Sequence, residues 1–397
     1  MAKAGVLYIS YDGMLEPLGQ SQVLAYLRKL AEDRCIVLMS FEKPADWADD
    51  ARRTALADSI KAAGIRWVPL TYHKSPSLPA TLFDLAQGMV VALWLALRHR
   101  LRIVHTRSYL PAAMALPVKL FTGARFLFDM RGLWPDERVD GGLWPKGGRV
   151  YRAVKALERH LLLKADHVVT LTDASLAEIR SFPYLQARTV PMTMIPTCAD
   201  LDHFNRSSAP PPAPFTLGYL GSVGTWYLFD EVLECFALIR ARVPGARLLI
   251  VNRNEQDFIR GRLAVFGVEA SVATITAAQH QDVPKLIAQM TAGAAIIKPV
   301  YSKIASAPTK LAEYLGCGVP CIGNDRVGDM EAILEGERVG VALTDFSAAD
   351  RQAAVDRLFT LLEDPGLATR CRSVAQKLFS LDTGVTAYRA IYAGLDR

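Results

Sequence analysis

The residues best suited to chemistry lie in one segment, residues 306–320, which read SAPTKLAEYLGCGVP. Pro308 favours the first position of a helix, and Ser306 or Thr309 can cap it, so the pattern predicts that a helix begins here. Backbone N–H groups at a helix N-terminus attract anions. With the ammonium group of Lys310 beside them, these N–H groups form a predicted anion site.

The same short helix carries the other residues of this predicted site. Leu311 lies in its first turn, and Glu313 falls about one turn further along, where a carboxylate can accept hydrogen bonds from ribose hydroxyl groups. Gly316 and Gly318 predict its end. The alternative interpretation is a short surface helix whose lysine and glutamate are simply solvated.

A second candidate is the glycine-containing loop in residues 218–227, GYLGSVGTWY. Gly221 and Gly224 flank Ser222 directly after an apolar run, which suits a diphosphate that lies against backbone amides. Thr225 belongs to the same loop, and we include it among the predicted binding residues. A plain tight turn is the alternative.

The third candidate is the loop after the first predicted strand, residues 10–22, which read SYDGMLEPLGQSQ. Gly19 permits a close approach of the backbone to a ligand, and Ser21 can cap the helix that follows. An ordinary connection between a strand and a helix has the same composition. The glycines do not form a GxGxxG fingerprint, so an NAD-binding domain gains no support.

Short apolar, β-rich runs alternate with amphipathic helices, which predicts parallel sheets covered by helices on both faces. The predicted strands are Val6–Ser10, Ile36–Phe41, Ile65–Leu70, Ile103–His105, Phe126–Asp129, His167–Leu171 and Thr193–Ile195, then Thr216–Leu220, Arg247–Val251, Ala273–Ile275, Ala294–Ile297 and Cys321–Gly323. In the first half, the predicted helices cover about residues 20–32, 46–63, 79–99, 110–121, 148–164 and 173–181. Because the whole scheme starts again at Thr216, we expect an α/β fold of two similar Rossmann-like, doubly wound domains.

The boundary between the two predicted domains lies at a proline-rich stretch. Residues 207–214, SSAPPPAP, cannot form a helix or a central strand, because proline lacks the amide donor. We place the hinge at about 196–214. The first domain then covers 1–200 and the second 201–382.

Bulk composition excludes several classes of protein. With 397 residues the chain is too long for one ordinary core. A net charge of +6 is too dilute to indicate a nucleic-acid partner, although it suits anionic lipid or phosphate-bearing substrates. Six scattered cysteines without a CxxC pair argue against a disulfide framework or a zinc site and favour a reducing cytosol.

The chain is expected to be cytoplasmic. Its N-terminus lacks the pattern of a signal peptide, and its most apolar helical stretch, Gly88–Leu97, is about ten residues, far short of the roughly 20 that span a bilayer. We therefore expect neither secretion nor integration into a membrane.

Two predicted helices nevertheless suggest contact with anionic lipid on the inner face of the cytoplasmic membrane. Helix 148–164 separates an apolar face from a basic one, a pattern for which plain solvation is the alternative. Helix 79–99 adds Trp94, and three arginines follow it, at positions 98, 100 and 102.

Taken together, these features resemble the retaining glycosyltransferases of the GT-B fold, specifically family four, the glycosyl transferases group 1. The resemblance spans essentially the whole chain, and its most specific motif is Pro308-Thr309-Lys310-Leu311-Ala312-Glu313-Tyr314 followed by Gly318-Val319-Pro320. The weaker motifs are the glycine-containing first loop, Pro196 with Asp200-Leu201 and Phe204, and Gly218-Tyr219-Leu220-Gly221-Ser222.

The resemblance implies two domains that face each other across a cleft. The second would bind a nucleotide-diphosphate sugar and the first an acceptor, with the final helix, 383–397, packed back on the first domain. It also implies that Glu313 is the second glutamate of the family's Glu-x7-Glu motif, which holds the ribose.

This sequence departs from the family pattern at two places. Ala305 replaces the first glutamate of that motif, and Ser302, Lys303 or Ser306 are the candidates to substitute for it. The family's Arg and Lys pair for the donor phosphates is also not evident after the first strand of the second domain. The nearest cationic candidates are Arg253, Lys298 and Lys310.

The resemblance places the acceptor near Asp129 and Arg131, which follow a strand of the first domain. An ionised Asp129 can orient or deprotonate the acceptor hydroxyl, and Arg131 can bind an acceptor phosphate. The alternative for Asp129 is structural support of the loop at Trp134. His105, at the end of the neighbouring strand, is either a functional residue or a satisfied core histidine.

The activity implied is retaining transfer of a sugar, with UDP-sugars favoured over GDP-sugars, to a glycan or lipid-linked acceptor in cell-envelope or polysaccharide biosynthesis. No cofactor or metal is expected, because Asp200-Leu201-Asp202 reads as a loop cap. Three alternatives with the same fold stay open. They are a non-catalytic partner subunit, which Ala305 and the missing basic pair favour, a nucleotide-sugar epimerase and a phosphorylase.

Overall fold

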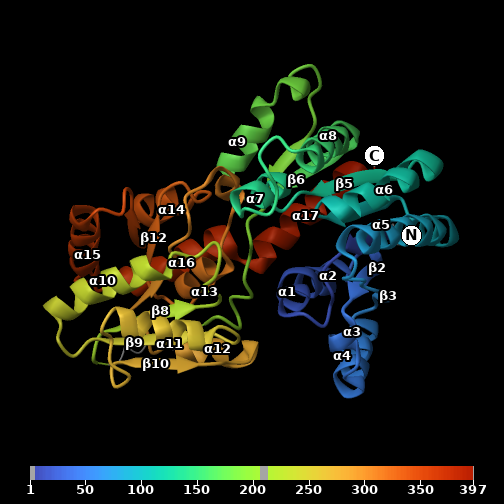
Figure 1. Cartoon of the computed structure of the whole chain (residues 1–397). Coiled ribbons are helices and arrows are strands. Elements are labelled where there is room, and N and C mark those ends of the chain that lie inside the picture. The colour runs from blue at the N-terminus through green and yellow to red at the C-terminus, as the bar shows by residue number, and fades with distance from the viewer. Residues whose placement is uncertain (1–4, 206–212, 397) are drawn as a thin grey trace. The chain divides into compact units, whose positions relative to one another are not determined.

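The computed structural model describes residues 5–205 and 213–396, and the chain divides into two compact units (Figure 1). Unit 1 consists of Met1–Pro196 and Leu381–Arg397, and unit 2 of Thr197–Ser380. The C-terminal helix therefore belongs to the first unit. The chain passes from one unit to the other after Pro196 and after Ser380, a few residues before the predicted domain boundaries at 200 and 382. Most of the proline-rich stretch predicted as the linker lies outside the described residues.

Unit 1 is built on a seven-stranded parallel sheet with the order β3-β2-β1-β4-β5-β6-β7. Its strands are β1 Gly5–Ser10, β2 Cys35–Glu42, β3 Arg66–Thr71, β4 Ile103–Arg107, β5 Arg125–Asp129, β6 His167–Thr170 and β7 Met192–Met194. The central strands are buried at nearly every position, which is the pattern of a sheet covered on both faces.

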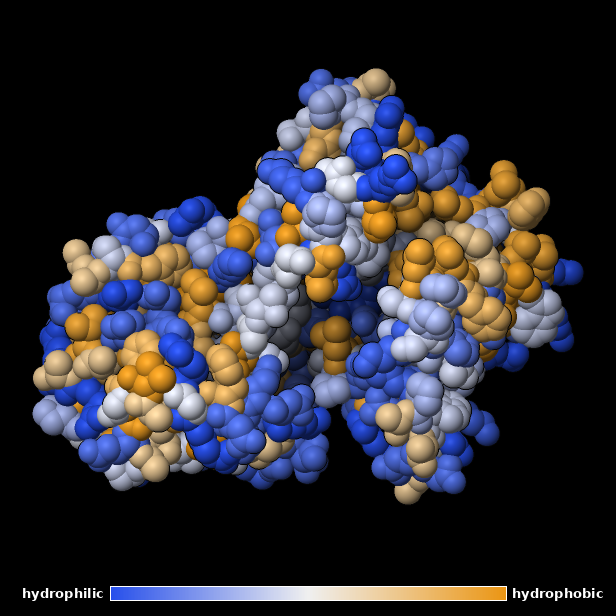
Figure 2. Space-filling model, viewed as in Figure 1, coloured by the Kyte–Doolittle hydropathy of each residue, from blue (hydrophilic) through white to orange (hydrophobic). Residues whose placement is uncertain are grey.

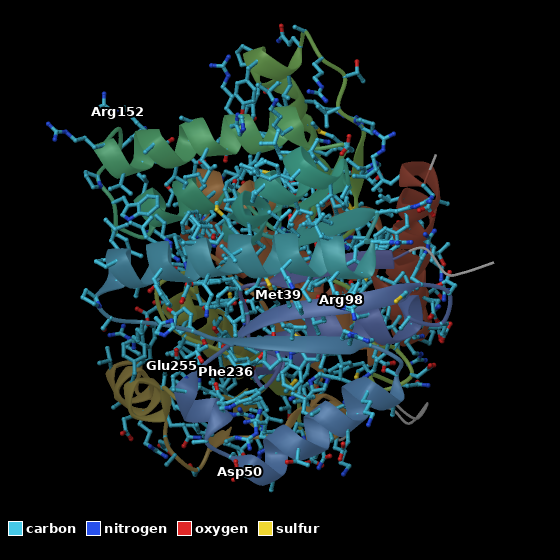
Figure 3. The ribbon with its side chains drawn as sticks, turned by 90° about the vertical axis from the view of Figure 1, so that its right-hand side faces the viewer. Met39, Asp50, Arg98, Arg152, Phe236 and Glu255 are labelled. Atoms are coloured by element: carbon cyan, nitrogen blue, oxygen red, sulfur yellow. The ribbon has the colours of Figure 1, made fainter. Side chains whose placement is uncertain are left out.

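The helices of unit 1 connect these strands. They are α1 Pro17–Gly19, the π-helical turn Gln20–Leu24, α2 Ala25–Leu30, α3 Pro44–Trp47, α4 Asp50–Ala62, α5 Ser77–His99, α6 Tyr109–Thr122, α7 Trp134–Asp140, α8 Arg149–Lys164, α9 Asp173–Ser181, the 3-10 turn Pro183–Leu185 and α17 Leu381–Leu395. Helices α5, α6 and α8 lie in one row (Figure 3), and α17 packs against α2.

Unit 2 repeats the scheme with a six-stranded parallel sheet of order β10-β9-β8-β11-β12-β13. Its strands are β8 Thr216–Leu220, β9 Arg247–Val251, β10 Ala273–Thr276, β11 Ala292–Ala294, β12 Cys321–Asn324 and β13 Gly340–Leu343. Its helices are α10 Phe229–Arg242, α11 Gln256–Val265, α12 Val283–Ile287, α13 Thr309–Gly316, α14 Met330–Gly336, α15 Ala348–Leu362 and α16 Leu367–Phe379, with 3-10 turns at His280–Asp282 and Tyr301–Ala305.

The core of unit 2 has one layer on each face of its sheet. Leu217 and Tyr219 of β8 point into the layer under α10 and α15, whereas Leu220 belongs to the layer under α13 and α16. This alternation along one strand explains why the run is apolar throughout. The predicted two-domain Rossmann-like architecture is confirmed.

Both sheets have a topological switch point, where the strand order reverses direction. In unit 1 it lies between β1 and β4, and in unit 2 between β8 and β11. Ligands of open α/β sheets bind beyond the carboxyl ends of the strands at such points. The loops after β1, β4, β5, β8 and β9 are therefore the places to look for a site.

Some predicted elements differ from the structure. Strand β13 and helix α7 were not predicted, and the strand predicted at Ala294–Ile297 is β11, at Ala292–Ala294. The predicted helix 20–32 begins earlier, at Pro17, and includes a π-helical turn. Ser21 lies inside it and donates its hydroxyl hydrogen to the carbonyl of Pro17 (2.9 Å), so Ser21 does not cap this helix.

Helix α5 also differs from the expectation. By length and composition it is apolar enough to cross a membrane, with 33% of its most apolar 18-residue window buried. The expected limit of about ten apolar residues, Gly88–Leu97, was therefore wrong, because the residues before Gly88 are nearly as apolar and continue the same helix.

Candidate active site

The loop after β8 and the start of α13 lie beside each other in unit 2. Gly221, directly after β8, has a φ of +90°, and a methyl group built on its Cα would lie 3.7 Å from Nζ of Lys310. A positive φ is easily adopted only by glycine, so the turn that exposes this backbone depends on that residue. The structure thus brings two of the three predicted segments together.

Lys310 is the most unusual residue of this site. Its side chain is buried, and Nζ lies 4.5 Å from the ring centroid of Tyr219 and 4.1 Å from that of Tyr227. Nζ has no hydrogen-bond acceptor in the described part of the chain. Burial lowers the pKa of Lys310 to about 8. A buried ammonium group without an acceptor is costly unless a ligand supplies one, and an anion is the natural choice.

A second lysine also lies over an aromatic ring. Lys303, in the turn before α13, is buried, and its Nζ lies 3.9 Å from the ring centroid of Trp226. The loop 222–227 therefore carries aromatic rings where the family pattern has basic residues. Lysines from two other segments lie over those rings, as cations do over π faces. Sequence reasoning named both lysines but could not see which rings hold them.

Glu313 is partly buried one turn along α13 from Lys310. Burial raises its pKa to about 7, and the charge of Lys310 opposes this rise only in part. A carboxyl group poised near neutrality can accept hydrogen bonds from hydroxyl groups of a ligand. The contact between Glu313 and a ribose stays a prediction.

The start of α13 differs from the predicted capping. Pro308 is itself the N-cap residue, and no side chain caps the helix, so neither Ser306 nor Thr309 has the predicted role. The proline ring offers no acceptor, which leaves the first turn without a side-chain partner. Leu311 packs in the core, and its N–H donates to the carbonyl of Pro308 (3.0 Å), so it offers a ligand neither group.

The other predicted residues of unit 2 lie around this centre. Ser222 and Thr225 are exposed in the loop after β8, and the carbonyl of Ser222 accepts a hydrogen bond from the hydroxyl of Tyr219 (2.5 Å). Lys298 is exposed, and its N–H donates to the carbonyl of Trp226 (2.8 Å). Lys298 thus fixes the aromatic loop through its backbone.

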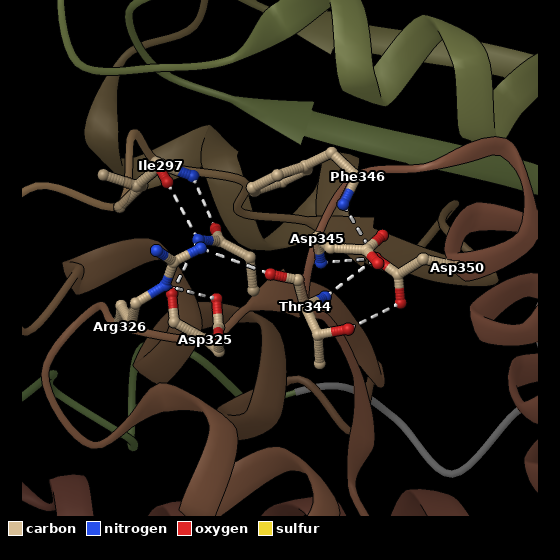
Figure 4. Close-up of polar contacts among 8 residues, drawn as sticks. Ile297, Asp325, Arg326, Thr344, Asp345, Phe346 and Asp350 are labelled. Atoms are coloured by element: carbon tan, nitrogen blue, oxygen red, sulfur yellow. Dashed lines mark hydrogen bonds and ion pairs between the residues drawn. The ribbon is translucent and has the colours of Figure 1, made fainter.

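The segment that leads from β11 to α13 is held by a buried amide (Figure 4). Asn324, at the end of β12, accepts a hydrogen bond from the N–H of Ile297 (2.8 Å) and donates one to the carbonyl of the same residue (2.9 Å). Beside it, Asp350 accepts hydrogen bonds from three consecutive N–H groups after β13, those of residues 344–346. The contact of Asn324 with Ile297 holds the start of the segment that carries both lysines, and the contacts of Asp350 hold the loop after β13.

A cavity of about 430 Å³ opens beyond the carboxyl ends of β9 and β10. Arg253 borders it and donates to the carbonyl of Ala278 and to Oε1 of Gln279, both at 3.4 Å. Its remaining lining residues are Thr276, Ala277, Asp282, Lys285 and Leu286. Cavities of this size hold small organic ligands. Sequence reasoning missed this pocket, although the end of strand β10 was a signal for it.

In unit 1, Asp129 lies at the carboxyl end of β5 and is almost fully buried. Its Oδ2 accepts a hydrogen bond from the hydroxyl of Tyr388 (2.9 Å), and NH1 of Arg131 lies 3.8 Å away. Its Oδ1 has no hydrogen-bond partner among the described residues. Burial alone would raise the pKa of Asp129, but the charge of Arg131 and the neighbouring His105 hold it below its ordinary value.

His105 is a packed core residue. Its Nδ1 lies 2.7 Å from the hydroxyl oxygen of Tyr392, and its ring contacts Tyr8 with centroids 4.5 Å apart. Burial lowers the pKa of His105, which favours the neutral ring. Of the two interpretations drawn from sequence, the geometry fits the core histidine better.

Two further features mark this end of the sheet. Arg131 has a φ of 59°, a backbone conformation that a non-glycine residue rarely adopts and that often marks functional sites. Arg107, which sequence reasoning did not single out, ends β4 between Ser10 and Asp129, and its Nε lies 3.1 Å from Oδ2 of Asp12. The signal in the sequence that could have identified Arg107 was its position at the end of β4, a strand beside the switch point.

Two other sequence predictions can be located. A Cβ on Gly19 would lie 2.1 Å from the carbonyl oxygen of Gly13, so the close approach that Gly19 permits is to its own loop. Asp200 accepts hydrogen bonds from the N–H groups of Asp202 (3.1 Å) and His203 (3.3 Å), which is the predicted loop cap. Residues 5–205 and 213–396 contain no group of three or more His, Cys, Asp or Glu side chains that could hold a metal ion.

Comparison with known domain families matches both units. Residues 21–198 match the glycosyl transferase 4-like domain, and residues 202–378 match the glycosyl transferases group 1 domain. No curated protein matches the chain.

Solved structures with the same fold include HepE from Anabaena in complex with UDP and glucose, at 14% identity and a TM-score of 0.68, with 99% of this chain and 100% of that chain covered. Sucrose-phosphate synthase from Thermosynechococcus elongatus is similar at 16% identity and a TM-score of 0.71, with 99% of each chain covered. The apo form of the lipopolysaccharide outer core galactosyltransferase WaaB is similar at 12% identity and a TM-score of 0.63, with 98% of this chain and 99% of that chain covered. Because both domain models match and the chain has two parallel-sheet units, it belongs to the GT-B glycosyltransferases that resemble family four.

Proposed function

We propose that this protein transfers a sugar, with retention of anomeric configuration, from a UDP-sugar to a hydroxyl group of a glycan or lipid-linked acceptor in cell-envelope or polysaccharide biosynthesis. The observation that carries the proposal is the buried ammonium group of Lys310, which has no acceptor among the described residues and lies beside the glycine turn after β8. HepE is seen in complex with UDP and glucose, and WaaB is a lipopolysaccharide outer core galactosyltransferase, which supports the donor class and the biosynthetic role.

The chemistry of the donor explains the need for such a cation. When a nucleoside diphosphate leaves a sugar, negative charge grows on its phosphate oxygens. Fixed donors near these oxygens stabilise the transition state more than the ground state. We assign this stabilisation to Lys310, Lys303 and the uncapped first turn of α13, rather than to a metal ion.

The rest of the donor extends along the carboxyl ends of the strands in unit 2. We propose that the ribose hydroxyl groups donate to Glu313 and that the base occupies the cavity bordered by Arg253. Ala305 leaves the sugar ring without the family's first glutamate. Ser302, Lys303 and Ser306 are the nearby polar residues that can replace that contact.

The acceptor is assigned to unit 1. An ionised Asp129 would orient the attacking hydroxyl, and Arg131 would bind a phosphate of a lipid-linked acceptor. The acceptor hydroxyl attacks from the front side, and no covalent intermediate forms on the enzyme. We propose that the protein acts in the cytoplasm, in peripheral contact with the inner face of the cytoplasmic membrane.

A second candidate function is a non-catalytic partner subunit, which the loss of the first glutamate at Ala305 favours. Release of UDP or GDP from a panel of UDP-sugars and GDP-mannose separates the two functions. A transferase is expected to hydrolyse its own donor slowly without acceptor, and thermal shift identifies which donor binds. A donor that binds but is never turned over, with or without extracted lipid acceptors, would favour the partner subunit.

Donor binding is expected to weaken as the pH rises through about 8. The charged form of Lys310 binds the diphosphate, and its pKa of about 8 means that this form is lost above that pH. The Kd for UDP should therefore change little below about pH 7, roughly double between pH 7 and 8, and then rise by up to about tenfold per pH unit.

Calorimetric titration with UDP at a series of pH values measures this effect. Lys310→Met supplies the control, because ionisation of UDP itself affects both proteins equally. A wild-type Kd that parallels the variant's over pH 7 to 9.5 would contradict the assignment.

A further inference from the structure

The outer surface of helix α5 carries no charge before Arg98. Its exposed positions between Ser77 and Arg98 form a stripe of Leu78, Pro79, Leu82, Phe83, Ala86, Val90, Trp94 and Leu97. Asp84 is the one charged residue in residues 77–97, and it faces inward, where it accepts hydrogen bonds from the hydroxyl of Tyr11 (2.8 Å) and the N–H of His73 (3.0 Å). Two thirds of the apolar window of this helix are thus not buried.

The inner face of the same helix carries the smaller residues. Ala80, Gly88, Ala92 and Ala96 are buried against the fold, and a Cβ on Gly88 would lie 2.5 Å from the sulfur of Met114 in α6. An ordinary surface helix has its large apolar side chains inside and its charged ones outside. In α5 most of the buried residues are small, Leu95 being the large apolar one, and most of the exposed residues are large, so packing within the protein does not account for the exposed large residues.

Helix α6 extends the apolar surface. Both α5 and α6 are crossovers of the parallel sheet, so they run in the same direction. Since Gly88 meets Met114, the residues one to two turns later, Trp94 and Leu120, lie at about the same level. Leu120 and Phe121 are 76% and 68% exposed. Hydrophobic side chains gather over α5 and α6 in Figure 2, and the two helices lie side by side in Figure 3.

A basic fringe borders this surface at one end. Arg98, Arg100 and Arg102 follow the stripe directly, and all three are exposed. Apolar side chains in the interface plane, an aromatic residue among them and arginines at the headgroup level are the pattern of a helix that lies on an anionic bilayer. The buried Asp84 and the packing on α6 favour a helix that stays part of unit 1 over one that spans the membrane.

Helix α8 does not share this pattern. Leu161 and Leu162 are buried in the fold, while Arg152 and Arg159 are exposed. Arg152 extends away from the row of helices in Figure 3. Because α8 has the usual order of a water-facing helix, its basic face requires no partner.

We propose that the α5–α6 surface, defined by the exposed apolar residues of α5, by Leu120 and Phe121 and by the three arginines, binds the surface of an anionic phospholipid bilayer. This inference rests on the proposed function and specifies its membrane contact. The start of the stripe lies near the carboxyl edge of the sheet, since Asp84 contacts Tyr11 after β1. The surface thus leads toward the end of unit 1 at which Asp129 lies, as a lipid-linked acceptor requires.

Vesicle sedimentation of the full chain tests the surface. We expect binding to vesicles of phosphatidylglycerol and phosphatidylethanolamine at low salt, and little binding to pure phosphatidylcholine. The triple variant V90E/W94E/L120E should lower the partition coefficient by more than about tenfold, because each apolar side chain placed in the bilayer contributes strongly. Replacement of Arg98, Arg100 and Arg102 by Gln should lower it by about fivefold per residue and remove the preference for anionic lipid.

The matched control is a pair of single variants, Val90→Glu and Val265→Glu, which place one charge on equally exposed valines of α5 and of unit 2; only Val90→Glu should weaken vesicle binding. As a second readout, vesicles with brominated acyl chains should quench tryptophan fluorescence, and Trp94→Phe should remove most of this quenching without loss of binding. Calorimetric titration with UDP, in solution, should give the same Kd for every variant.

Two results would contradict the proposed binding of the α5–α6 surface to a bilayer. One is equal vesicle binding by wild type and the triple variant, or binding by neither, in proteins that still bind UDP. The other is a dimer in sedimentation velocity that the triple variant separates, since the occupant would then be a second copy of the chain. Failure of the wild type to bind any nucleotide would contradict the proposed donor site instead. The vesicle measurement would then still test whether the α5–α6 surface binds a bilayer.

Discussion

Replacement of Lys310 by methionine is expected to lower kcat for sugar transfer by about 10²–10³-fold, the loss seen when one preorganised charge-stabilising donor is removed. The physical reason is the position of Nζ, which is buried between the rings of Tyr219 and Tyr227 and beside the turn at Gly221. A leaving diphosphate at that turn meets a cation that water screens little. Methionine keeps an unbranched apolar side chain, one atom shorter than that of lysine, and removes the ammonium group.

Thermal unfolding distinguishes this role from a structural one. Removal of a buried ammonium group that has no acceptor in residues 5–205 and 213–396 should leave Tm unchanged or raise it, because desolvation of that charge opposes folding. Steady-state kinetics with the donor identified by thermal shift give the rate. Lys377→Met, an exposed lysine of α16 paired with Glu337, is the matched control and should keep wild-type activity.

Two results would count against the assignment. Wild-type kcat in Lys310→Met would show that the diphosphate binds elsewhere. A large fall in Tm together with the loss of activity would show instead that the lysine supports the packing of Tyr219 and Tyr227.

Much of the fold could be predicted from the sequence, because parallel strands buried on both faces are apolar throughout. Strand β8 was predicted at Thr216–Leu220 and β9 at Arg247–Val251, and the structure has both at those positions. Strand β13 was missed, since Gly340–Leu343 is only four residues long and follows a short helix. The order of the strands follows from the doubly wound scheme once two domains are recognised.

The candidate site could be predicted only as separate segments. The sequence indicates a helix N-terminus at Pro308 and a glycine turn at Gly221, but not that Tyr227 and Tyr219 enclose Lys310. Such contacts depend on the packing of the β8 loop against α13, for which periodicity gives no signal. Likewise, the hydroxyl that holds Asp129 comes from Tyr388, 259 residues further along the chain.

The exposed surface of α5 is a second feature that could be predicted only in part from the sequence. An apolar helix within an α/β sequence is normally read as core, and the sequence alone does not tell which face the sheet covers. The sequence suggested that Trp94 is exposed, but only the structure shows that Ala80, Gly88 and Ala92 face inward and that Val90 faces outward with Trp94. The small residues are what allow α5 to approach α6 closely.

Replacement of Asp129 by asparagine is expected to lower kcat for sugar transfer by about 10²–10⁴-fold, the usual range for loss of a group that accepts or orients a proton. The carboxylate is ionised at neutral pH, since Arg131 and His105 hold its pKa below the ordinary value despite its burial. Its Oδ1 has no hydrogen-bond partner among the described residues and can accept a hydrogen bond from an acceptor hydroxyl. Asparagine has the same shape but cannot serve as a base.

The Kd for UDP should not change in Asp129→Asn, because every residue assigned to the donor lies in unit 2. Tyr388→Phe is the matched control: it removes the hydrogen bond to Oδ2 but leaves the carboxylate, so its rate should fall less than about tenfold. Transfer kinetics and calorimetric titration with UDP measure both quantities. Near-normal turnover in Asp129→Asn would remove Asp129 from the mechanism, and equal losses of rate and Tm in both variants would show that the carboxylate only anchors α17 to the sheet.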